Sequence, residues 1–531
     1  MVQPNFLIFI TDQQSAEFLG CYGHPVLKTP HIDAIAARGT RFDNFYVANP
    51  ACQPNRATLM TGRMPSLHKV RSNGIPLSLQ AVTFTDLLKA HGYNTALIGK
   101  SHLQNMLDLP TIAKQPEPKY PDALPPKDFA EATRPAPDDG PYDQEHPHRW
   151  QRNEPLEMTL PYYGYDHVDL CTGHGGKVGG HYYQWLVRQR ADVDTLRDPD
   201  NQLAHDYACP QAYRLTLPEE LHPTNYVAER AMEYLSENGA NGAPFCLTVS
   251  FPDPHHPFTP PGRYWDLYDP ADMDLPRSFS CADDELPPHV QWARRERKEG
   301  RSVIGSQSAF AVTEREAREA RALTCGMIAL IDDAVGRVMG ALHGTSAGEN
   351  TVVVFMSDHG DYLGSHGLLL KGPLHYRALV RTPFIWADTH DRPAKNAATD
   401  ALCGTLDFGR SILDRASIEP FNGMQGQSIL DILDGNSDGA DAMLIEDEGQ
   451  RAYLGYTSPP KIRSLITKGW RLTVAHNADW GELYDLAHDP HEMCNLWDDT
   501  EFAAQKSELL FGLVRKQASL SDTSPWPTAR A

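Results

Sequence analysis

The chain of 531 residues has no apolar run long enough to span a bilayer and no excess of positive charge. A transmembrane helix needs roughly 18 consecutive apolar residues, whereas the longest candidates, Phe6–Ile10 and Val352–Phe355, have the length of buried strands. The chain carries 48 Lys and Arg against 69 Asp and Glu, a formal net charge of −21. Because nucleic acids and anionic membranes attract clustered positive charge, we expect neither as a partner. The sequence predicts a soluble protein.

The cysteines lack the pattern of a disulfide framework, and a secretory leader is not expected. Nine cysteines, an odd number without paired spacing, do not describe a disulfide framework. The N-terminus lacks the basic segment of a signal peptide, and its apolar stretch stops at Thr11. We therefore expect a cytoplasmic protein. Apolar residues make up 41% and charged residues 22%, which is typical of a folded globular chain.

Short apolar segments alternate with amphipathic ones along the chain. Helices are expected from Thr29 to Gly39, from Thr83 to Gly92 and around Cys325–Leu342. Strands are expected over four short apolar runs: Asn5–Thr11, Asn94–Gly99, Phe245–Phe251 and Thr351–Met356. Buried strands that alternate with helices predict an α/β fold with a large, mainly parallel sheet flanked by helices.

The length and the C-terminal pattern predict a second, smaller unit. One core stops growing at roughly 250–300 residues, and short strand-like runs such as Leu465–Thr467 and Arg471–Val474 follow Gly439. We expect a larger domain over residues 1–437 and a small C-terminal α+β subdomain with an antiparallel sheet over residues 438–531. Residues 104–220 are predicted to form a proline-rich insertion within the first, either an inert surface loop or a lid or subunit-contacting arm.

One glycine-rich segment resembles a phosphate-binding loop. Gly173-His174-Gly175-Gly176-Lys177 has the lysine of such a loop, but it lacks the spacing and the Ser or Thr after the lysine. The segment therefore predicts a flexible turn.

Polar, chemically capable side chains follow four of the predicted strands. They are Asp12 and Gln13, Lys100 and His102, His255 and His256, and Asp358 and His359. Because the carboxyl ends of parallel strands form the ligand crevice of an open α/β sheet, we expect these groups to converge. Carboxylate and amide oxygens with one imidazole suit a divalent cation, Ca²⁺ or Mn²⁺ and less readily Mg²⁺. The absence of a nearby thiolate pair makes a structural zinc site a poor interpretation.

The most specific segment is Cys52-Gln53-Pro54-Asn55-Arg56, which continues to Thr61-Gly62. Here the sequence resembles the sulfatase family of the alkaline-phosphatase superfamily, whose motif is Cys/Ser-x-Pro-x-Arg followed by Thr-Gly. Gly99–His102 matches the family's Gly-Lys-x-His, and Pro254–Phe258 matches its Pro-His-x-Pro-Phe/Tyr, which favours His255 over His256. The segment from Lys371 to Phe384 matches the family's lysine segment. The stretch from Glu482 to Leu496 matches its C-terminal motif and is interpreted as structural.

The resemblance implies a sulfatase-like catalytic domain and a modified nucleophile. A formylglycine-generating enzyme would oxidise Cys52 to formylglycine, and a divalent cation would be bound by Asp12, Gln13, Asp358, His359 and the modified side chain. The substrate would be a small sulfate ester of the arylsulfatase type. In this interpretation the hydrated aldehyde, held by Arg56, attacks sulfur. The other expected roles follow the same resemblance: Lys100, Lys371 and Asn73 on the sulfuryl oxygens, His255 as general acid, and His102 as the base that releases sulfate.

Two departures from the family pattern keep an alternative open. Gln13 stands where family members often have a second aspartate, and Asn73 is placed as in phosphonate monoester hydrolases; Gln13 also resembles choline-sulfatases. Lys100 and His102 favour a sulfatase instead. The alternatives are therefore a phosphonate monoester or phosphodiester hydrolase and, more remotely, a non-catalytic anion- or metal-binding homologue. The second departure is Arg377, where the family usually has Glu.

The organic part of the substrate is harder to infer. Five side chains are candidates for an aromatic wall, although packing within the protein competes with this role: Tyr162, Tyr163, His181, Tyr182 and Trp185. A homo-oligomer is compatible with the sequence.

Overall fold

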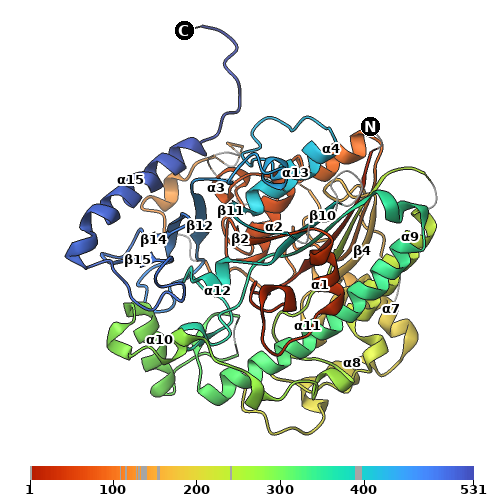
Figure 1. Cartoon of the computed structure of the whole chain (residues 1–531), viewed down its shortest axis with the longest axis horizontal. Coiled ribbons are helices and arrows are strands. Elements are labelled where there is room, and N and C mark those ends of the chain that lie inside the picture. The colour runs from red at the N-terminus through yellow and green to blue at the C-terminus, as the bar shows by residue number, and fades with distance from the viewer. Residues whose placement is uncertain are drawn as a thin grey trace.

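The computed structural model describes residues 3–107, 109–113, 117–126, 128–129, 132, 140–151, 156–239, 242–305, 307–388 and 397–530. A nine-stranded sheet lies at the centre of the protein (Figure 1). Its strands, in spatial order, are β11 (Ala397–Gly404), β2 (Thr40–Tyr46), β10 (Phe384–Asp388), β8 (Thr351–Ser357), β1 (Asn5–Thr11), β6 (Phe245–Ser250), β3 (Asn94–Lys100), β4 (His167–Thr172) and β5 (Gly179–Gly180). Only β10 and β5 run against the direction of the others. The prediction of a mainly parallel sheet is confirmed.

Helices cover both faces of the sheet. One layer consists of α1 (Pro30–Ala37), α7 (His181–Gln189), α9 (Pro223–Asn238) and α11 (Glu314–His343), and the other of α2 (Cys52–Thr61), α4 (Phe84–Ala90) and α13 (Thr405–Arg415). Alternate side chains of β1 enter the two cores, Leu7 and Phe9 on one face and Phe6 and Ile8 on the other. This alternation follows from the two-residue period of a strand. It explains why the central strands are apolar throughout.

The long helix α11 begins earlier than the sequence predicts. The Thr313 hydroxyl accepts a hydrogen bond from the Glu316 backbone N–H, and the Glu316 carboxylate accepts one from the Thr313 N–H at 2.8 Å. This reciprocal capping box satisfies two N–H groups at the start of the helix. The sequence predicts only the C-terminal half of α11, because apolar periodicity is clear in that half whereas the first turns carry many charges.

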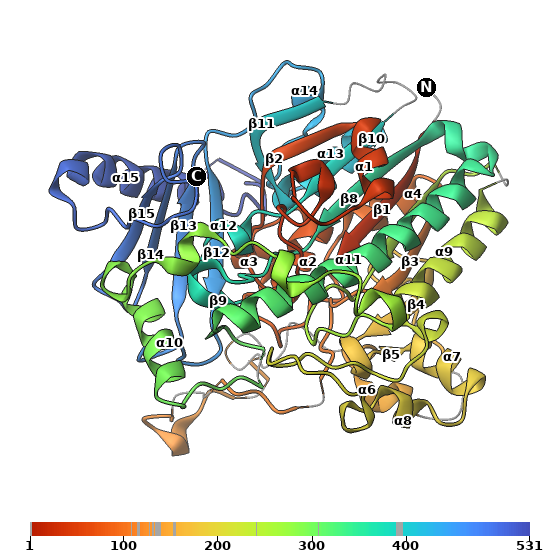
Figure 2. The same ribbon diagram turned by 60° about the horizontal axis from the view of Figure 1, so that its bottom comes forward.

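The predicted insertion contributes both to the surface and to the core. Strand β4 pairs with β3, and Tyr182 and Leu186 of α7 are buried in the first core. The short helices α6 (Pro147–Trp150) and α8 (Val193–Arg197) gather near α7 along the lower edge of the view in Figure 2. The predicted domain and insertion boundaries stay predictions.

A second sheet forms the C-terminal part of the chain. Its antiparallel strands β12 (Met443–Glu448), β13 (Lys461–Ile466), β14 (Trp470–Ala475) and β15 (Gly481–Asp485) pair in chain order. Helix α15 (Ala503–Ser519) packs on them, in blue beside the large sheet in Figure 1. The predicted small antiparallel sheet is confirmed. The remaining elements are α3 (Pro65–His68), α10 (Pro288–Lys298), α12 (Arg377–Val380), α14 (Leu430–Leu433), β7 (Phe310–Ala311) and β9 (Leu368–Leu369).

A buried arginine joins the small sheet to the large domain. The Arg471 guanidinium donates to Glu482 at 2.8 Å and to Glu492 at 2.5 Å. Glu492 also accepts a hydrogen bond from the Arg377 backbone N–H at 2.7 Å and, through its carbonyl oxygen, contacts His366 Nε2 at 2.8 Å. The C-terminal motif is thus structural, as the sequence predicts. It holds the segment around residues 366–377, which carries Lys371. Nothing in the structure explains the Arg377 side chain.

No helix within the described ranges is long and apolar enough to cross a membrane.

Replacing Arg471 with Met should destabilise the protein by about 3–5 kcal/mol, because two buried carboxylates lose their partner. The free energy of unfolding in urea measures this, with the Tm as a second readout. The matched control is Arg190→Met, since Arg190 and Asp192 are about half exposed. The control should leave the Tm unchanged. Equal free energies of unfolding for Arg471→Met and Arg190→Met would contradict the role of Arg471 in joining the small sheet to the rest of the protein.

Candidate active site

Six parts of the chain converge at one edge of the large sheet. The carboxyl ends of β1, β3, β4, β6 and β8 meet the first turn of α2 there. Residue Thr11 of β1 pairs with Ser357 of β8, so that Asp12 and Asp358 leave the sheet side by side. The Asp12 N–H donates to the Asp253 carbonyl at 3.0 Å, and the Asp358 N–H donates to the Thr11 carbonyl at 3.1 Å. The predicted groups therefore lie together.

Four side chains form a buried ligand cluster. One possible ligand atom from each of Asp12, Cys52, Asp358 and His359 lies within 4.8 Å of the others. His359 Nδ1 lies 2.8 Å from the Gly360 carbonyl, to which it donates, and its Nε2 therefore faces Cys52 Sγ at 2.9 Å. Two carboxylates and an imidazole in this arrangement can hold a divalent cation.

Gln13 adjoins this cluster, because its backbone N–H donates to Asp358 Oδ1 at 3.2 Å. Its amide nitrogen donates to Asp361 Oδ2 at 2.5 Å and lies 2.9 Å from His256 Nδ1. Its amide oxygen is buried and has no hydrogen-bond partner among the described residues. A buried carbonyl oxygen without a donor is costly, and a cation between the carboxylates would satisfy it. The donor set therefore fits a hard or borderline divalent cation.

Cys52 occupies the first position of α2 and is surrounded by positive charge. Its sulfur lies 3.0 Å from Lys371 Nζ and 3.7 Å from Asp12 Oδ1. Burial and Asp12 raise the pKa of the thiol, but Lys100, Lys371 and His359 outweigh them, so the net pKa is lowered. The N-terminus of α2 adds favourable potential for an anion at this position.

Arg56 lies one helical turn after Cys52 and ties the strand ends together. Its Nε donates to Asp358 Oδ2 at 2.7 Å, while Nη1 donates to the Lys100 carbonyl at 2.9 Å and to Ser250 Oγ at 3.0 Å. Its Nη2 has no hydrogen-bond partner within the described parts of the chain. Arg56 therefore has one donor group to offer an anionic ligand.

Two buried lysines flank Cys52. Lys100 Nζ contacts the Asp12 carboxylate and lies 2.9 Å from His174 Nε2. Lys371 Nζ lies 2.9 Å from His255 Nε2 and 3.2 Å from His359 Nε2. Burial lowers the pKa of Lys371, but the negative charges of Cys52 and Asp12 outweigh it and raise the pKa overall. Lys371 is therefore an ammonium group at neutral pH.

His174 belongs to the site, although the sequence predicts a flexible turn there. Its ring stacks on His255 with centroids 3.5 Å apart, and its Nε2 lies 3.2 Å from Asp12 Oδ2. Burial and Lys100 lower the pKa of His174 to about 3, so the ring is neutral. The sequence holds one indication that His174 belongs to the site. It follows the carboxyl end of β4, just as the other site residues follow the carboxyl ends of their strands. The glycines around it suggested a loop instead.

The proline-rich region positions His102 through Glu145, which sequence reasoning missed. The Glu145 carboxylate accepts hydrogen bonds from the backbone N–H groups of His102 at 2.8 Å and of Leu103 and Gln104 at 2.9 Å. His102 has a positive φ of 57°, a conformation that needs such support. Burial and Lys100 lower the pKa of His102 well below its usual value, so the ring is neutral. This part of the region is not an inert loop.

A cavity of about 420 Å³ opens beside Cys52 and is also lined by Asn73, His102 and His174. Asn73 Oδ1 accepts a hydrogen bond from the Gln53 N–H at 3.2 Å, so its amide nitrogen is the atom it can offer a ligand. The proposed aromatic wall is wrong. None of its five members lines this cavity, because Tyr162, Tyr163 and Tyr182 are buried within the two cores and the other two lie outside the lining.

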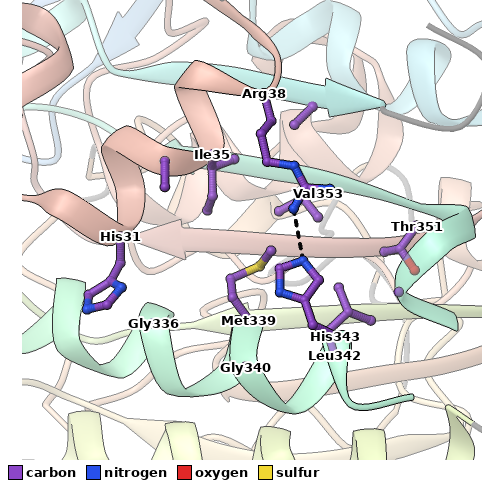
Figure 3. Close-up of a pocket in the computed structure, with 13 residues that line it drawn as sticks. His31, Ile35, Arg38, Gly336, Met339, Gly340, Leu342, His343, Thr351 and Val353 are labelled. Atoms are coloured by element: carbon purple, nitrogen blue, oxygen red, sulfur yellow. Dashed lines mark hydrogen bonds between the residues drawn. The ribbon is translucent and has the colours of Figure 1, made fainter. Parts of the chain in front are cut away.

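Another cavity, of about 250 Å³, lies between α1 and α11 at the opposite end of β8 (Figure 3). Its lining is mostly apolar, and Arg38 Nη1 donates to His343 Nε2 at 3.0 Å across it. Thr351, at the first position of β8, lines it, whereas Asp358 follows the last position. This cavity contains none of the residues of the site.

Two family models match the chain. The model described as sulfatase matches residues 4–109 and 165–418. The model described as the C-terminal part of N-sulphoglucosamine sulphohydrolase matches residues 364–519.

Named relatives and solved structures agree with these matches. The arylsulfatase of Clostridium perfringens is 26% identical over 509 residues, which cover 94% of this chain and 92% of the relative. The multifunctional alkaline phosphatase superfamily protein PehA of Trinickia caryophylli is 26% identical over 535 residues, with 95% and 93% covered. The phosphonate monoester hydrolase of Agrobacterium radiobacter superposes with a TM-score of 0.74 at 23% identity, covering 98% of this chain and 97% of that one. The sulfatase model covers well over half of the residues, and the chain therefore belongs to the sulfatase family and is a sulfuric ester hydrolase.

Proposed function

We propose that the protein hydrolyses small sulfate esters, with Cys52 oxidised to formylglycine, whose aldehyde adds water to form the diol that acts as the nucleophile. The observation that supports this most is the position of Cys52, which belongs to the ligand cluster and lies 3.0 Å from Lys371 Nζ. A nucleophile beside a cation site and an ammonium group is placed to attack a tetrahedral anion. The motif Cys52–Arg56 would be the segment that a formylglycine-generating enzyme recognises.

Asp12, Gln13, Asp358 and His359 would hold one divalent cation, together with the modified side chain at position 52. When bound, the cation supplies Lewis-acid chemistry, polarising oxygens and favouring an ionised nucleophile. The oxygen-rich donor set suits Ca²⁺ and Mn²⁺. The His359 imidazole favours Mn²⁺ over Ca²⁺, because Ca²⁺ takes oxygen ligands.

Three basic side chains would bind the sulfate group. Lys100 and Lys371 lie on two sides of Cys52, and the free Nη2 of Arg56 adds a third donor. Buried charges of this kind stabilise the negative charge on the nonbridging oxygens without reorganising. The Asn73 amide nitrogen would add one neutral hydrogen bond.

His255 would protonate the leaving alcohol or phenol. Its Nδ1 lies 2.5 Å from the His256 carbonyl, to which it donates, so Nε2 faces Lys371 and the reacting group. Burial and the neighbouring His174 and Lys371 lower the pKa of His255. The negative charge of a bound ester raises it again, which lets Nε2 carry the proton that the leaving oxygen takes. His102 would act as the base in the step that releases sulfate.

A second specificity, for phosphonate monoesters or phosphodiesters, is favoured by Gln13 and Asn73. These esters share the tetrahedral shape and single negative charge of a sulfate ester, so the same basic groups can bind them. A non-catalytic homologue is not favoured, because binding alone needs neither a nucleophile nor an acid and a base.

We expect Cys52 to be modified in active protein. Mass spectrometry of the peptide that contains residue 52 should show an aldehyde in active protein, and Cys52→Ala should reduce kcat to background. Full activity with an unmodified thiol would contradict the mechanism. Cys209→Ala is the control, because Cys209 is also buried but lies outside the site; it should retain activity.

Relative activities on matched substrates distinguish a sulfatase from a phosphonate or phosphodiester hydrolase. With metal-loaded protein whose residue 52 is verified as formylglycine, kcat/KM should be higher for an aryl sulfate than for the matching aryl phosphonate and phosphodiester. A higher value for the phosphonate would overturn the assignment of sulfate as the preferred substrate and leave the chemistry of the site intact.

The proposed role of His255 as general acid predicts a dependence on the leaving group. His255→Ala should slow hydrolysis of esters with poor leaving groups about 10²–10⁴-fold, and esters of acidic phenols much less, because their oxygen leaves without a proton. A series of phenyl sulfates of increasing phenol pKa measures this. An equal loss across the series would show that His255 has another role.

A further inference from the structure

The cavity beside Cys52 extends beyond what sulfate hydrolysis needs. Its lining contains Cys52, His102 and His174 and also six residues of the segment that begins at Met106 and ends at Ile112. We call the five apolar ones, Met106, Leu107, Leu109, Pro110 and Ile112, the apolar ribbon; the sixth is Thr111. None of these side chains takes part in the proposed chemistry.

The apolar ribbon is exposed to solvent to an unusual degree. The exposed fractions are 52% for Leu107, 75% for Leu109 and 53% for Ile112. Single exposed leucines are ordinary, but three large apolar side chains within a few residues, all lining one cavity, form a patch. Such patches at a concave site mark a surface that a ligand covers.

The ribbon begins at a fixed point of the active site. It follows directly on the segment His102–Gln104, whose backbone is held by the buried Glu145 carboxylate. The ribbon therefore belongs to the same stretch of chain as His102, and both line the cavity that contains Cys52. A group that rests on the ribbon shares this cavity with the proposed nucleophile.

The cavity also has polar lining residues. Gln307, Gln450 and Arg451 are among them, and Arg451 Nη2 donates to Ser308 Oγ at 2.8 Å. No carboxylate belongs to the described lining of this cavity. The side chains that line the cavity within the described part of the chain therefore place no carboxylate against a sulfate ester, although the chain as a whole has a net charge of −21.

We propose, building on the proposed function, that the apolar ribbon binds the leaving group and that this group is an apolar aryl or alkyl alcohol. The hydroxyl groups of a sugar would lie against side chains that offer no hydrogen bonds, and burying them unpaired costs binding energy. An aryl or alkyl group covers the exposed leucines instead. The ribbon thus determines specificity for the organic half of the ester.

The experiment measures binding without turnover. The probes are n-alkanesulfonates from ethane- to octanesulfonate, which carry the sulfur oxyanion on a bond that is not hydrolysed. Calorimetry with metal-loaded protein, verified as formylglycine at residue 52, should show the affinity rising about two- to fourfold for each added CH₂ that reaches the ribbon. No rise with chain length, or no binding of any sulfonate, overturns the proposal.

The variant L107S/L109S removes apolar surface from the ribbon. It should flatten the chain-length dependence, so that octanesulfonate binds no more than about twofold more tightly than ethanesulfonate. The matched control is Leu124→Ser, since Leu124 is 59% exposed in the same proline-rich region but does not line the cavity. The control should keep the chain-length dependence of the unchanged protein. An equal dependence in L107S/L109S overturns the proposal.

Turnover measured in parallel separates this inference from the proposed function. A chain-length dependence without hydrolysis of any sulfate ester supports the ribbon and contradicts the proposed function. Hydrolysis of aryl sulfates without a chain-length dependence contradicts only the ribbon. A higher kcat/KM for glucose 6-sulfate than for hexyl sulfate also overturns the leaving-group assignment.

Discussion

The parallel pairing of β1 with β8 places two carboxylates next to each other in a buried site, and much of the structure compensates for that charge. Asp12 and Asp358 leave paired strands at adjacent positions. Arg56 neutralises one and Lys100 the other. A buried pair of like charges is unfavourable unless cations balance it. The basic residues of the site therefore balance the charge of these carboxylates as well as offering charge to a substrate, and a cation would add to the same balance.

This balance also explains how an acidic protein handles an anionic substrate. The net charge of −21 describes the solvent-facing surface, which repels polyanions over distances up to the Debye length. Arg56, Lys100 and Lys371 are buried, where their charges act at short range and with little screening. A small anion that enters the cavity meets a local positive potential. The surface and the site can thus have opposite preferences in one chain.

Much of the fold and of the site could be predicted because the signals were local. Each apolar strand, each group of polar residues that follows a strand, and the Cys52–Arg56 motif occupies only a few consecutive residues. His174 and Glu145 were missed because their roles depend on tertiary contacts: stacking on His255 in one case, and backbone N–H groups about forty residues earlier in the other. The tyrosines near residue 162 were misassigned for the same reason, since composition does not reveal which face of the chain is covered.

The order of synthesis gives the buried position of Cys52 a further meaning. Cys52, Pro54 and Arg56 are all buried in the folded protein. Cys52 contacts His359 and Arg56 contacts Asp358, and both partners follow strand β8, which begins only at Thr351. At about 5–20 residues per second, the ribosome would need on the order of 15–60 seconds to travel from the motif to that strand. During this interval the motif is a segment of nascent chain, open to a modifying enzyme. Once β8 pairs with β1, that opportunity closes, so the proposed oxidation of Cys52 would have to precede the completion of the site.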